Sequence, residues 1–244
     1  TQNLPDPTVI PSEHFNTVLY DGTGVAPISI TGVGFQPDFV WLKPRNYAAN
    51  HRLIDVLRTN ASNGYDELFS NATDIESAVA DRWSIDADGV TIDSTDTNYN
   101  GASGNYVLWN WKANGSGVSN TNGSITSTVS ANQDAGFSIV SYTGNGGANV
   151  SIGHGLTQAP EIIIYKNRSA TSDWLANITV LDGSLDYVWL NKTNASGNSA
   201  ETAPTSSVIY AWSGMLTNGN NYITYCFHSV DGYSKVGSYT GNGS

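Results

Sequence analysis

One stretch of the chain has the spacing of oxygen donors that a calcium ion requires. DTNYNG, from Asp96 to Gly101, matches the first half of the pattern D-x-[DN]-x-[DN]-G. It gives candidate metal ligands on Asp96, Asn98 and Asn100. The bidentate glutamate that closes such a loop is absent, because Val107 occupies its position. The sequence therefore predicts weak Ca²⁺ binding at most, and the alternative is a turn capped by these side chains without metal. No other cofactor is predicted.

Aromatic side chains are the second group that could bind a ligand. The chain has seven tryptophans and thirteen tyrosines, and flat rings can pack on the C–H faces of sugars. In the stretch NYVLWNWK, alternation sends Trp109 and Trp111 to one face, which we expect to be the core of a β-sandwich. Ligand platforms are therefore predicted only among aromatic residues in loops, where a rigid scaffold can display them: Tyr47, Tyr65, Tyr99 and Trp212.

The sequence carries no recognisable catalytic constellation. A glycoside hydrolase needs two carboxylates on either side of one bond, and none of the five glutamates lies in an E-x-D-x-x-E arrangement. There is no nucleophile elbow, and the four histidines lack metal-ligand spacing. The sequence therefore predicts a protein that is not an enzyme.

Composition disfavours several classes of partner. The formal net charge is −11, so the basic face that nucleic acids and anionic membranes require is not expected. The apolar runs are too short to span a bilayer, and no membrane insertion is predicted. Cys226 is the single cysteine, which excludes an intrachain disulfide and favours a buried structural thiol. Only 13% of residues are charged, so Asn, Ser, Thr and Gly must provide most of the polar surface.

Short apolar segments separated by Gly, Asn and Asp turns predict an antiparallel all-β fold. RWSIDADGVTIDS, with Asp88-Gly89 at its turn, is typical of a hairpin. HRLIDVLR (51–58) fits a helix or a strand equally well, and a short helix is predicted from Glu76 to Asp81.

The chain repeats itself. The segment from Phe15 to Asn46 recurs as the segment from Phe137 to Arg168, and YTGNG starts the pattern again near the end. A repeat of about 120 residues is the size of a domain. We expect two tandem antiparallel β-sandwich domains of jelly-roll or lectin-like type, and the alternative is one larger jelly roll formed by both halves. The predicted boundaries are an extended lead-in at 1–11, the first repeat at 12–113, a linker at 114–123, the second repeat at 124–234 and the start of a third repeat at 235–244.

Several long motifs resemble a tandem-repeat module of tailed phages, especially marine and cyanobacterial ones. They are SITGVGFQPDFVWLKPRN, NYVLWNWKANG, NTNGSITSTVSANQDAGFSIVSYTGNG, GHGLTQAPEIIIYKNR and YITYCFHSVDGYSKVGSYTGNGS. The resemblance extends from Phe15 to Ser244. The chain has FVWLKPR where the family commonly has FVWIKNR, and Pro44 removes a donor from that strand. The family also continues past the third YTGNG, so we expect this chain to be a fragment of a longer protein.

The resemblance implies a place on the virion surface, in a tail fibre, a knob or a capsid decoration protein similar in kind to lectin-like β-sandwiches. It implies other virion proteins or host cell-surface glycans as partners and homo-oligomers in the particle, and it assigns no catalytic residue. We expect a non-catalytic structural or surface-display module. The alternatives are a free-standing carbohydrate-binding lectin and a polysaccharide depolymerase.

Overall fold

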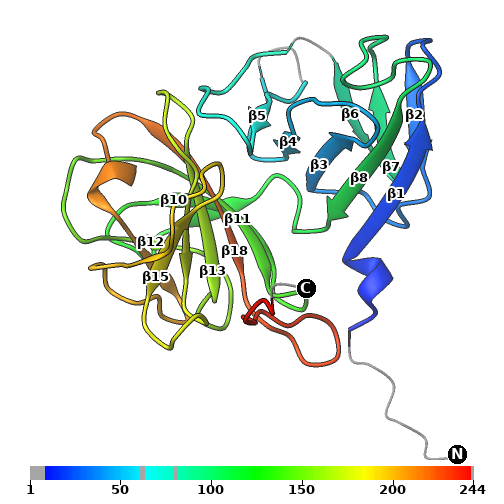
Figure 1. Cartoon of the computed structure of the whole chain (residues 1–244). Helices are drawn as coiled ribbons and strands as arrows, with labels where there is room; N and C mark the ends of the chain where they lie inside the picture. The colour runs from blue at the N-terminus through cyan, green and yellow to red at the C-terminus, as the bar shows by residue number, and fades with distance from the viewer. Residues whose placement is uncertain (1–8, 61–63, 80–81, 243–244) are drawn as a thin grey trace, which may run out of the picture.

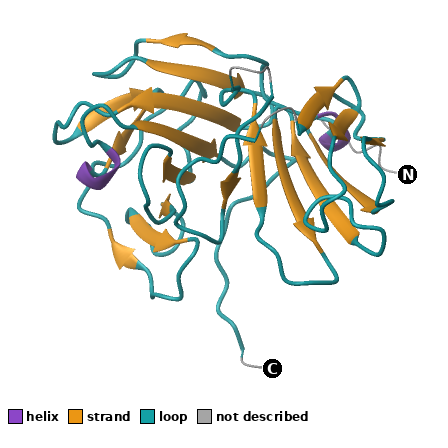
Figure 2. Cartoon of the chain, turned by 90° about the horizontal axis from the view of Figure 1, so that it is seen from above, coloured by secondary structure: helices purple, strands orange, loops and turns teal. Residues whose placement is uncertain are grey.

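The structure, a computed structural model, describes residues 9–60, 64–79 and 82–242. It is an all-β fold of antiparallel sheets, which confirms the predicted fold class. Figure 1 shows two lobes side by side: strands β1 to β8 form the first lobe, and strands β9 to β18 form the second. In the described residues, helix is confined to two short 3-10 turns, η1 (Pro11–Glu13) and η2 (Ser213–Met215), drawn in purple in Figure 2.

The first lobe contains two sheets. The larger has the strand order β1-β8-β3-β4-β5, and the smaller has the order β2-β7-β6. The larger sheet consists of β1 (Phe15–Asp21), β3 (Phe39–Pro44), β4 (Arg52–Asp55), β5 (Leu68–Phe69) and β8 (Asn105–Trp111). The smaller consists of β2 (Ile28–Thr31), β6 (Trp83–Asp86) and β7 (Gly89–Ile92). Strands β6 and β7 form the hairpin predicted around Asp88-Gly89.

The second lobe also contains a large and a small sheet. The large sheet has the order β16-β15-β14-β13-β18-β11-β10-β9, and β12 pairs with β17 in the small one. The large sheet consists of β9 (Val118–Asn120), β10 (Ser127–Asn132), β11 (Phe137–Thr143), β13 (Ile162–Asn167), β14 (Leu175–Ile178), β15 (Asp186–Trp189), β16 (Gly197–Asn198) and β18 (Asn221–Phe227). The small sheet consists of β12 (Val150–Gly153) and β17 (Val208–Ala211).

Apolar side chains fill the space between the two sheets of each lobe. In the first lobe, Ile30 and Val90 of the small sheet belong to one cluster with Val40 and Leu108 of the large sheet. In the second lobe, the corresponding cluster includes Ile152, Ile209, Val140 and Tyr165. Both lobes are therefore sandwich-like, since alternate residues of facing strands enter a shared core.

Strand β8 corrects the predicted position of the tryptophans. Tyr106 and Leu108 are fully buried in the core of the first lobe. Trp109 and Trp111 lie on the opposite, outer face of the strand and are half-buried. Alternation correctly assigned the two tryptophans to one face, but it does not determine which face is turned inward.

The two lobes share their central strand order. The order β1-β8-β3-β4 in the first lobe is matched by β11-β18-β13-β14 in the second. The rings of Tyr20 and Tyr106 stack with centroids 4.8 Å apart, and those of Tyr142 and Tyr222 stack at 5.1 Å. The Tyr106 hydroxyl accepts the N–H of Gly101 at 2.8 Å, and the Tyr222 hydroxyl accepts that of Thr217 at 3.0 Å.

A glycine lies beside each tyrosine pair. A Cβ atom added to Gly22 would be 2.1 Å from the carbonyl oxygen of Gly101, and one added to Gly144 would be 2.4 Å from that of Thr217. The chain approaches these carbonyls too closely for any side chain, so both positions require glycine.

Several predicted segments differ from the structure. The predicted linker 114–123 contains β9, which pairs with β10 at the edge of the eight-stranded sheet. HRLIDVLR contains strand β4, in which Leu53 and Asp55 contact the second lobe while Arg52 and Ile54 face the core of the first. No helix forms over 76–79, and residues 80–81 lie outside the described residues. Residues 235–242 carry no strand. Of the predicted lead-in, only 9–11 is described, and η1 begins at Pro11.

Two further predictions concern burial and membranes. Cys226 is fully buried, and burial raises the pKa of its thiol to about 12, so the thiol is an inert part of the core. In the part of the chain that the structure describes, no helix is long and apolar enough to cross a membrane.

A third apolar cluster joins the lobes across the seam between them. Phe39, Leu53 and Leu68 of the first lobe contact residues of β11 and β18 in the second lobe. Phe39 stacks on Tyr225 with ring centroids 4.3 Å apart. The outer faces of the two large sheets share this apolar cluster. The two lobes therefore pack against each other and are not separate domains joined only by a linker.

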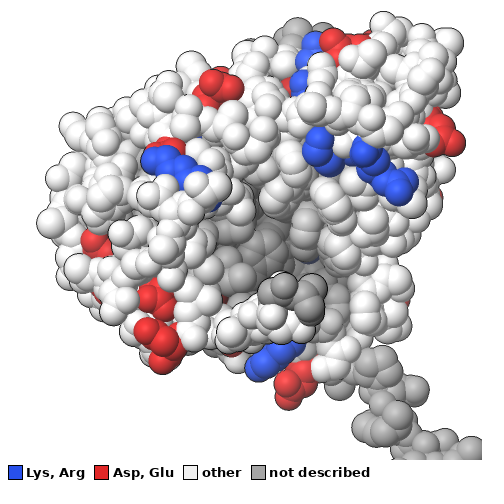
Figure 3. Space-filling view, in the orientation of Figure 1, with Lys and Arg blue, Asp and Glu red and all other residues white. Residues whose placement is uncertain are grey.

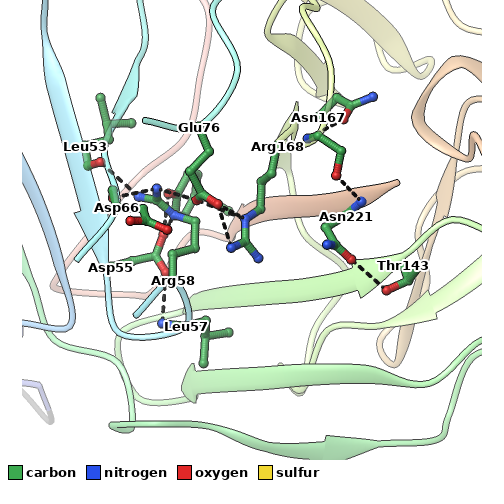
Figure 4. A network of polar contacts seen from close by, with 12 residues as sticks. Leu53, Asp55, Leu57, Arg58, Asp66, Glu76, Thr143, Asn167, Arg168 and Asn221 are labelled. Carbon is green, nitrogen blue, oxygen red and sulfur yellow. Dashed lines mark hydrogen bonds and ion pairs between the residues drawn. The ribbon is translucent and has the colours of Figure 1, made fainter. Parts of the chain in front are cut away.

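A buried polar network completes the seam (Figure 4). The Arg58 side chain is fully buried and donates to Asp55 at 2.6 Å and to Glu76 at 3.0 Å. Glu76 also accepts a hydrogen bond from Arg168 of the second lobe at 2.7 Å. The Tyr225 hydroxyl donates to Asp55 at 2.7 Å. Burial alone would lower the pKa of Arg58, but the carboxylates of Asp55 and Glu76 outweigh it and raise that pKa above its usual value.

Lys166 is a second cation in the seam. Its Nζ donates to the carbonyl of Thr73 in the first lobe at 3.0 Å and to that of Ser172 at 2.6 Å. Its side chain is buried, and burial lowers its pKa to about 8 despite the carboxylates of Asp74 and Asp173. The ammonium is therefore held by neutral carbonyls at a cost in desolvation.

Lys166 is expected to make stability depend on pH in the alkaline range. The unfolded side chain, with a pKa of about 10.4, binds more protons than the folded one above pH 8, so this residue adds stability as pH rises from 8 to 10. Urea unfolding at pH 7.5 and pH 9.5 should show the wild type gaining about 2 kcal/mol relative to Lys166→Met. Lys235→Met, at an exposed position, is the control. A pH-independent difference between wild type and Lys166→Met would contradict the prediction.

Candidate functional site

The second lobe has a pocket at the end of its eight-stranded sheet, beside the segment that follows β17. Its volume is about 250 Å³. Three aromatic rings, several uncharged polar groups and one carboxylate line it: Leu175, Asn177, Tyr187, Trp189, Asn198, Ser199, Ala200, Glu201 and Trp212. A concave site with aromatic walls and a few polar groups is typical of small-ligand binding.

The strand register places the aromatic side chains. Tyr187 lies opposite Asn177 and Trp189 opposite Leu175 in the β14–β15 pair, so all four share one face. The rings of Tyr187 and Trp189 meet edge to face at 6.0 Å, and those of Trp189 and Trp212 at 6.2 Å. The three rings therefore form a continuous wall.

Two glycines allow this arrangement. A Cβ atom on Gly197 would be 2.8 Å from the Tyr187 ring, and one on Gly214 would be 2.7 Å from the Trp212 ring. Each ring therefore packs directly on the backbone of a glycine, where a larger residue would clash. Trp212 keeps 42% of its surface exposed, so it is the ring most available to a ligand.

Polar groups surround the aromatic wall. Asn177 is buried and donates to the Asp186 carbonyl at 3.2 Å, which fixes the amide in the pocket wall. Ser199 accepts the backbone N–H of Glu201 at 3.3 Å through its hydroxyl. Glu201 is half-buried and is the acidic residue among those that line the pocket. Amides, a hydroxyl and a carboxylate are groups that can hydrogen-bond sugar hydroxyls.

The same place in the first lobe is filled. Arg52 lies opposite Leu42 as Leu175 lies opposite Tyr165, so it takes the position of Leu175. Its guanidinium lies 4.3 Å from the centroid of the Tyr99 ring, and its Nε is 3.5 Å from Glu67.

Glu67 is the centre of this buried group. It accepts hydrogen bonds from Trp83 and from Tyr99, each at 2.7 Å. Among the described residues, the ion pair and the two aromatic side chains occupy the space that is open in the second lobe.

The structure separates the four predicted aromatic platforms. Trp212 lines the pocket, as expected for a platform. Tyr99 is only 3% exposed, and burial and Glu67 raise its pKa to about 12. Tyr47 and Tyr65 are half-buried and pack against the first-lobe core, where the Tyr47 hydroxyl is 2.6 Å from that of Tyr106. The prediction is wrong for Tyr99, and Tyr47 and Tyr65 have structural contacts instead of a shared site, because a loop position does not reveal burial.

Hydrogen bonds within the protein engage the oxygens of two of the predicted calcium ligands, Asp96 and Asn100. Asp96 accepts hydrogen bonds from the backbone and the side chain of Asn98, both at 2.7 Å. Asn100 is fully buried, and its Oδ1 accepts the backbone N–H of Thr23 at 2.7 Å. The Asp96 carboxylate therefore caps a local turn, while the Asn100 amide joins its loop to the segment after β1. Among the described residues, no group of three or more His, Cys, Asp or Glu could hold a metal ion.

The sequence interpretation missed Tyr187, Trp189 and Asn177. The alternation in LDYVWLNK is a usable signal, because it sends Tyr187 and Trp189 to one face of a strand. Because strand aromatics are predicted to enter the core, neither ring is a predicted platform. Only the strand order shows that β15 lies near the sheet end, where its inner face is partly uncovered.

The fold and the pocket define a class: a sandwich-like all-β protein with an aromatic-lined pocket. Comparison with known families assigns residues 10–244 to the family described as Domain of unknown function (DUF7483), and the chain belongs to that family. No curated protein and no solved structure matches the chain.

Proposed function

We propose that this chain is a non-catalytic surface-display module of a phage virion, and that it binds host cell-surface glycans through the pocket of the second lobe. The observation that carries the proposal is the wall formed by Tyr187, Trp189 and Trp212 beside amide, hydroxyl and carboxylate groups. Sugars combine apolar C–H faces with hydroxyl groups, so both halves of this lining have a matching part in the ligand.

The composition supports a role outside the cell and on a particle. Charged residues are few and the net charge is −11, which disfavours nucleic acid as a partner. The sequence resemblance to phage tandem-repeat modules supports the virion surface, in a tail fibre, knob or capsid decoration protein that assembles with other virion proteins or with further copies of itself.

We further propose that the two lobes are tandem copies of one lectin-like sandwich domain. The common strand order, the two stacked tyrosine pairs and their shared hydrogen bonds support this interpretation over one larger jelly roll. In this interpretation the first copy closed its pocket with Arg52 and Glu67, and the second copy kept it open.

A glycan array tests the binding proposal. The labelled full chain is expected to bind a restricted set of glycans, and free sugar of the same type should compete. Absence of any glycan signal, on the array and with whole host cells, would overturn the proposed binding function. Immunogold labelling of intact particles separates a virion module from a free-standing lectin, since a lectin would not label the particle.

A depolymerase is the remaining alternative. Cleavage by the usual mechanism needs two carboxylates on either side of the bond, and Glu201 is the acidic residue among those lining the pocket. We expect no new reducing ends after prolonged incubation with host polysaccharide. Their appearance, and their loss in Glu201→Gln, would replace the binding proposal with an enzymatic one.

A further inference from the structure

The seam between the lobes has two unlike sides. On one side, the first lobe contributes Phe39 and Leu53 of its large sheet together with a loop, residues 69–76, here called the docking loop. The other side is the outer surface of β13 and β18 in the second lobe, here called the docking face, with Lys166, Arg168 and Tyr225. The docking loop offers the Phe69 carbonyl to Trp174 at 2.8 Å, the Thr73 carbonyl to Lys166 at 3.0 Å and the Glu76 carboxylate to Arg168 at 2.7 Å.

The first lobe carries a second docking face at the same strand positions. Lys43 lies opposite Val107 as Lys166 lies opposite Ile223, and Trp109 corresponds to Tyr225. Lys43 donates to the Ala49 carbonyl at 3.0 Å, which is the counterpart of the bond from Lys166 to Ser172.

Arg45 takes the place of Arg168 in this second face. Its backbone N–H donates to Asn105 at 2.7 Å, and that of Arg168 donates to Asn221 at 2.8 Å. The face of the first lobe therefore has the same lysine, arginine and ring as the face that is occupied in the seam.

This first-lobe face is open. Lys43, Arg45, Tyr47, Val107 and Trp109 line a shallow hollow of about 690 Å³. The Arg45 side chain is exposed, and within the described residues it forms no ion pair. Figure 3 shows basic side chains on the front of the first lobe with no acidic side chain between them. The chain has a net charge of −11, so an exposed arginine without an acidic neighbour is unusual on its surface. Arg45 is therefore available to an acidic or polar group of a partner.

The second lobe carries a second docking loop, residues 189–196. FSNATDIE at 69–76 and WLNKTNAS at 189–196 both contain Asn-x-Thr at the same offset. Asn71 accepts the His51 N–H at 2.9 Å, and Asn191 accepts the Trp174 N–H at 2.9 Å. Residues 192–196 of this second loop are exposed, whereas Leu190 at its start lines a small cavity in the seam.

The strand register fixes the alignment of the two loops. Glu67 pairs with Ser77 at the end of the first loop, and Tyr187 pairs with Gly197 at the end of the second. Ser196 therefore takes the place of Glu76. The second loop keeps the backbone shape of the first but lacks its carboxylate.

We propose that this protein associates head to tail, with the docking loop 189–196 of one copy seated on the docking face of the first lobe of the next. The inference rests on the proposed repeat, and the model for the contact is the seam inside the chain. Such an interface joins unlike surfaces, so each added copy leaves one free loop and one free face, and the assembly grows into an open chain or closes into a ring.

Sedimentation of the full chain at concentrations up to about 1 mM tests this proposal. Average mass should rise continuously with concentration for the wild type and for Lys235→Glu, a control with the same charge change at an exposed position outside both surfaces. Arg45→Glu disables the face, and Ser196→Arg disables the loop by placing a like charge against Arg45. Each variant alone should stay monomeric. Their equimolar mixture should form at least a dimer, because it retains one intact loop and one intact face.

A gain-of-function variant provides an independent arm. Ser196→Glu restores the carboxylate of Glu76 and should tighten association up to about fivefold, an effect that Arg45→Glu must abolish. A wild type that stays monomeric throughout, a variant mixture that fails to dimerise, or single variants that associate like the wild type would overturn the proposal. Circular dichroism verifies folding, and the glycan array is scored separately, so failure here leaves the binding proposal intact.

Discussion

Replacing Arg58 with methionine should lower the free energy of unfolding by about 3–5 kcal/mol. The Arg58 side chain is fully buried and donates four hydrogen bonds, to Asp55, Glu76 and the carbonyls of Leu53 and Asp66. Methionine fills the space but leaves the Asp55 carboxylate without its cation in a site from which water is excluded. Urea unfolding at pH 7 measures the loss.

Arg168→Met is the matched control for this prediction. The Arg168 side chain is 17% exposed, and without it Glu76 keeps its ion pair with Arg58, so the expected loss is about 1 kcal/mol. The seam also predicts one cooperative transition in the wild type, since both lobes share the cluster around Phe39 and Tyr225. A loss below 1 kcal/mol for Arg58→Met would show that the network contributes little to stability.

Removing the Trp212 ring should weaken glycan binding at least about 30-fold, the equivalent of roughly 2 kcal/mol for a tryptophan at the centre of a contact. Trp212 is the most exposed of the three rings, and its Trp189 neighbour would lose its edge-to-face partner. Titration of Trp212→Ala with the best sugar from the array, followed by isothermal calorimetry, measures the change. The free energy of unfolding should fall by about 1–2 kcal/mol, because the ring is more than half buried and loses its contact with Trp189, and circular dichroism should show that the variant remains folded.

Tyr239→Ala is the control for Trp212→Ala, because it removes an exposed aromatic ring that does not line the pocket. Tyr239 is 94% exposed and lies outside the pocket, so its removal should leave affinity unchanged. Asn177→Ala should reduce affinity through the polar wall and change the ranking of sugars that differ in hydroxyl orientation. Equal binding by Trp212→Ala and wild type would place the ligand elsewhere on the molecule.

Strand positions were predictable because their signals are local. The Asp88-Gly89 turn between two apolar runs specified the β6–β7 hairpin, and alternation specified the strand that became β8. The same alternation could not orient β8, since both of its faces are apolar and the outer one enters the seam through Trp111. A strand buried on both sides has no polar face to mark the exterior.

The seam and the pocket could not be predicted from the sequence, because the residues that form them are far apart along the chain. Glu76 and Arg168 are 92 residues apart, and Asp55 and Tyr225 are 170 apart. Nothing local marks such pairs, because the strand order alone brings them together. The pocket likewise exists in the second lobe through a choice of side chains, Leu175 in place of Arg52 and Tyr187 in place of Glu67, which is visible only once the strands are superimposed.

The filled position around Arg52 and Glu67 has a consequence for attachment. Under the proposed function, the pocket of the second lobe has no counterpart at the equivalent position of the first lobe, where Arg52 and Glu67 fill the space, so each chain would present one such site. A single shallow site holds a saccharide weakly, and firm adhesion then depends on how many chains face the same cell. Spacing between neighbouring copies would set the effective concentration for rebinding, so avidity would follow the geometry of the particle rather than the chemistry of one pocket.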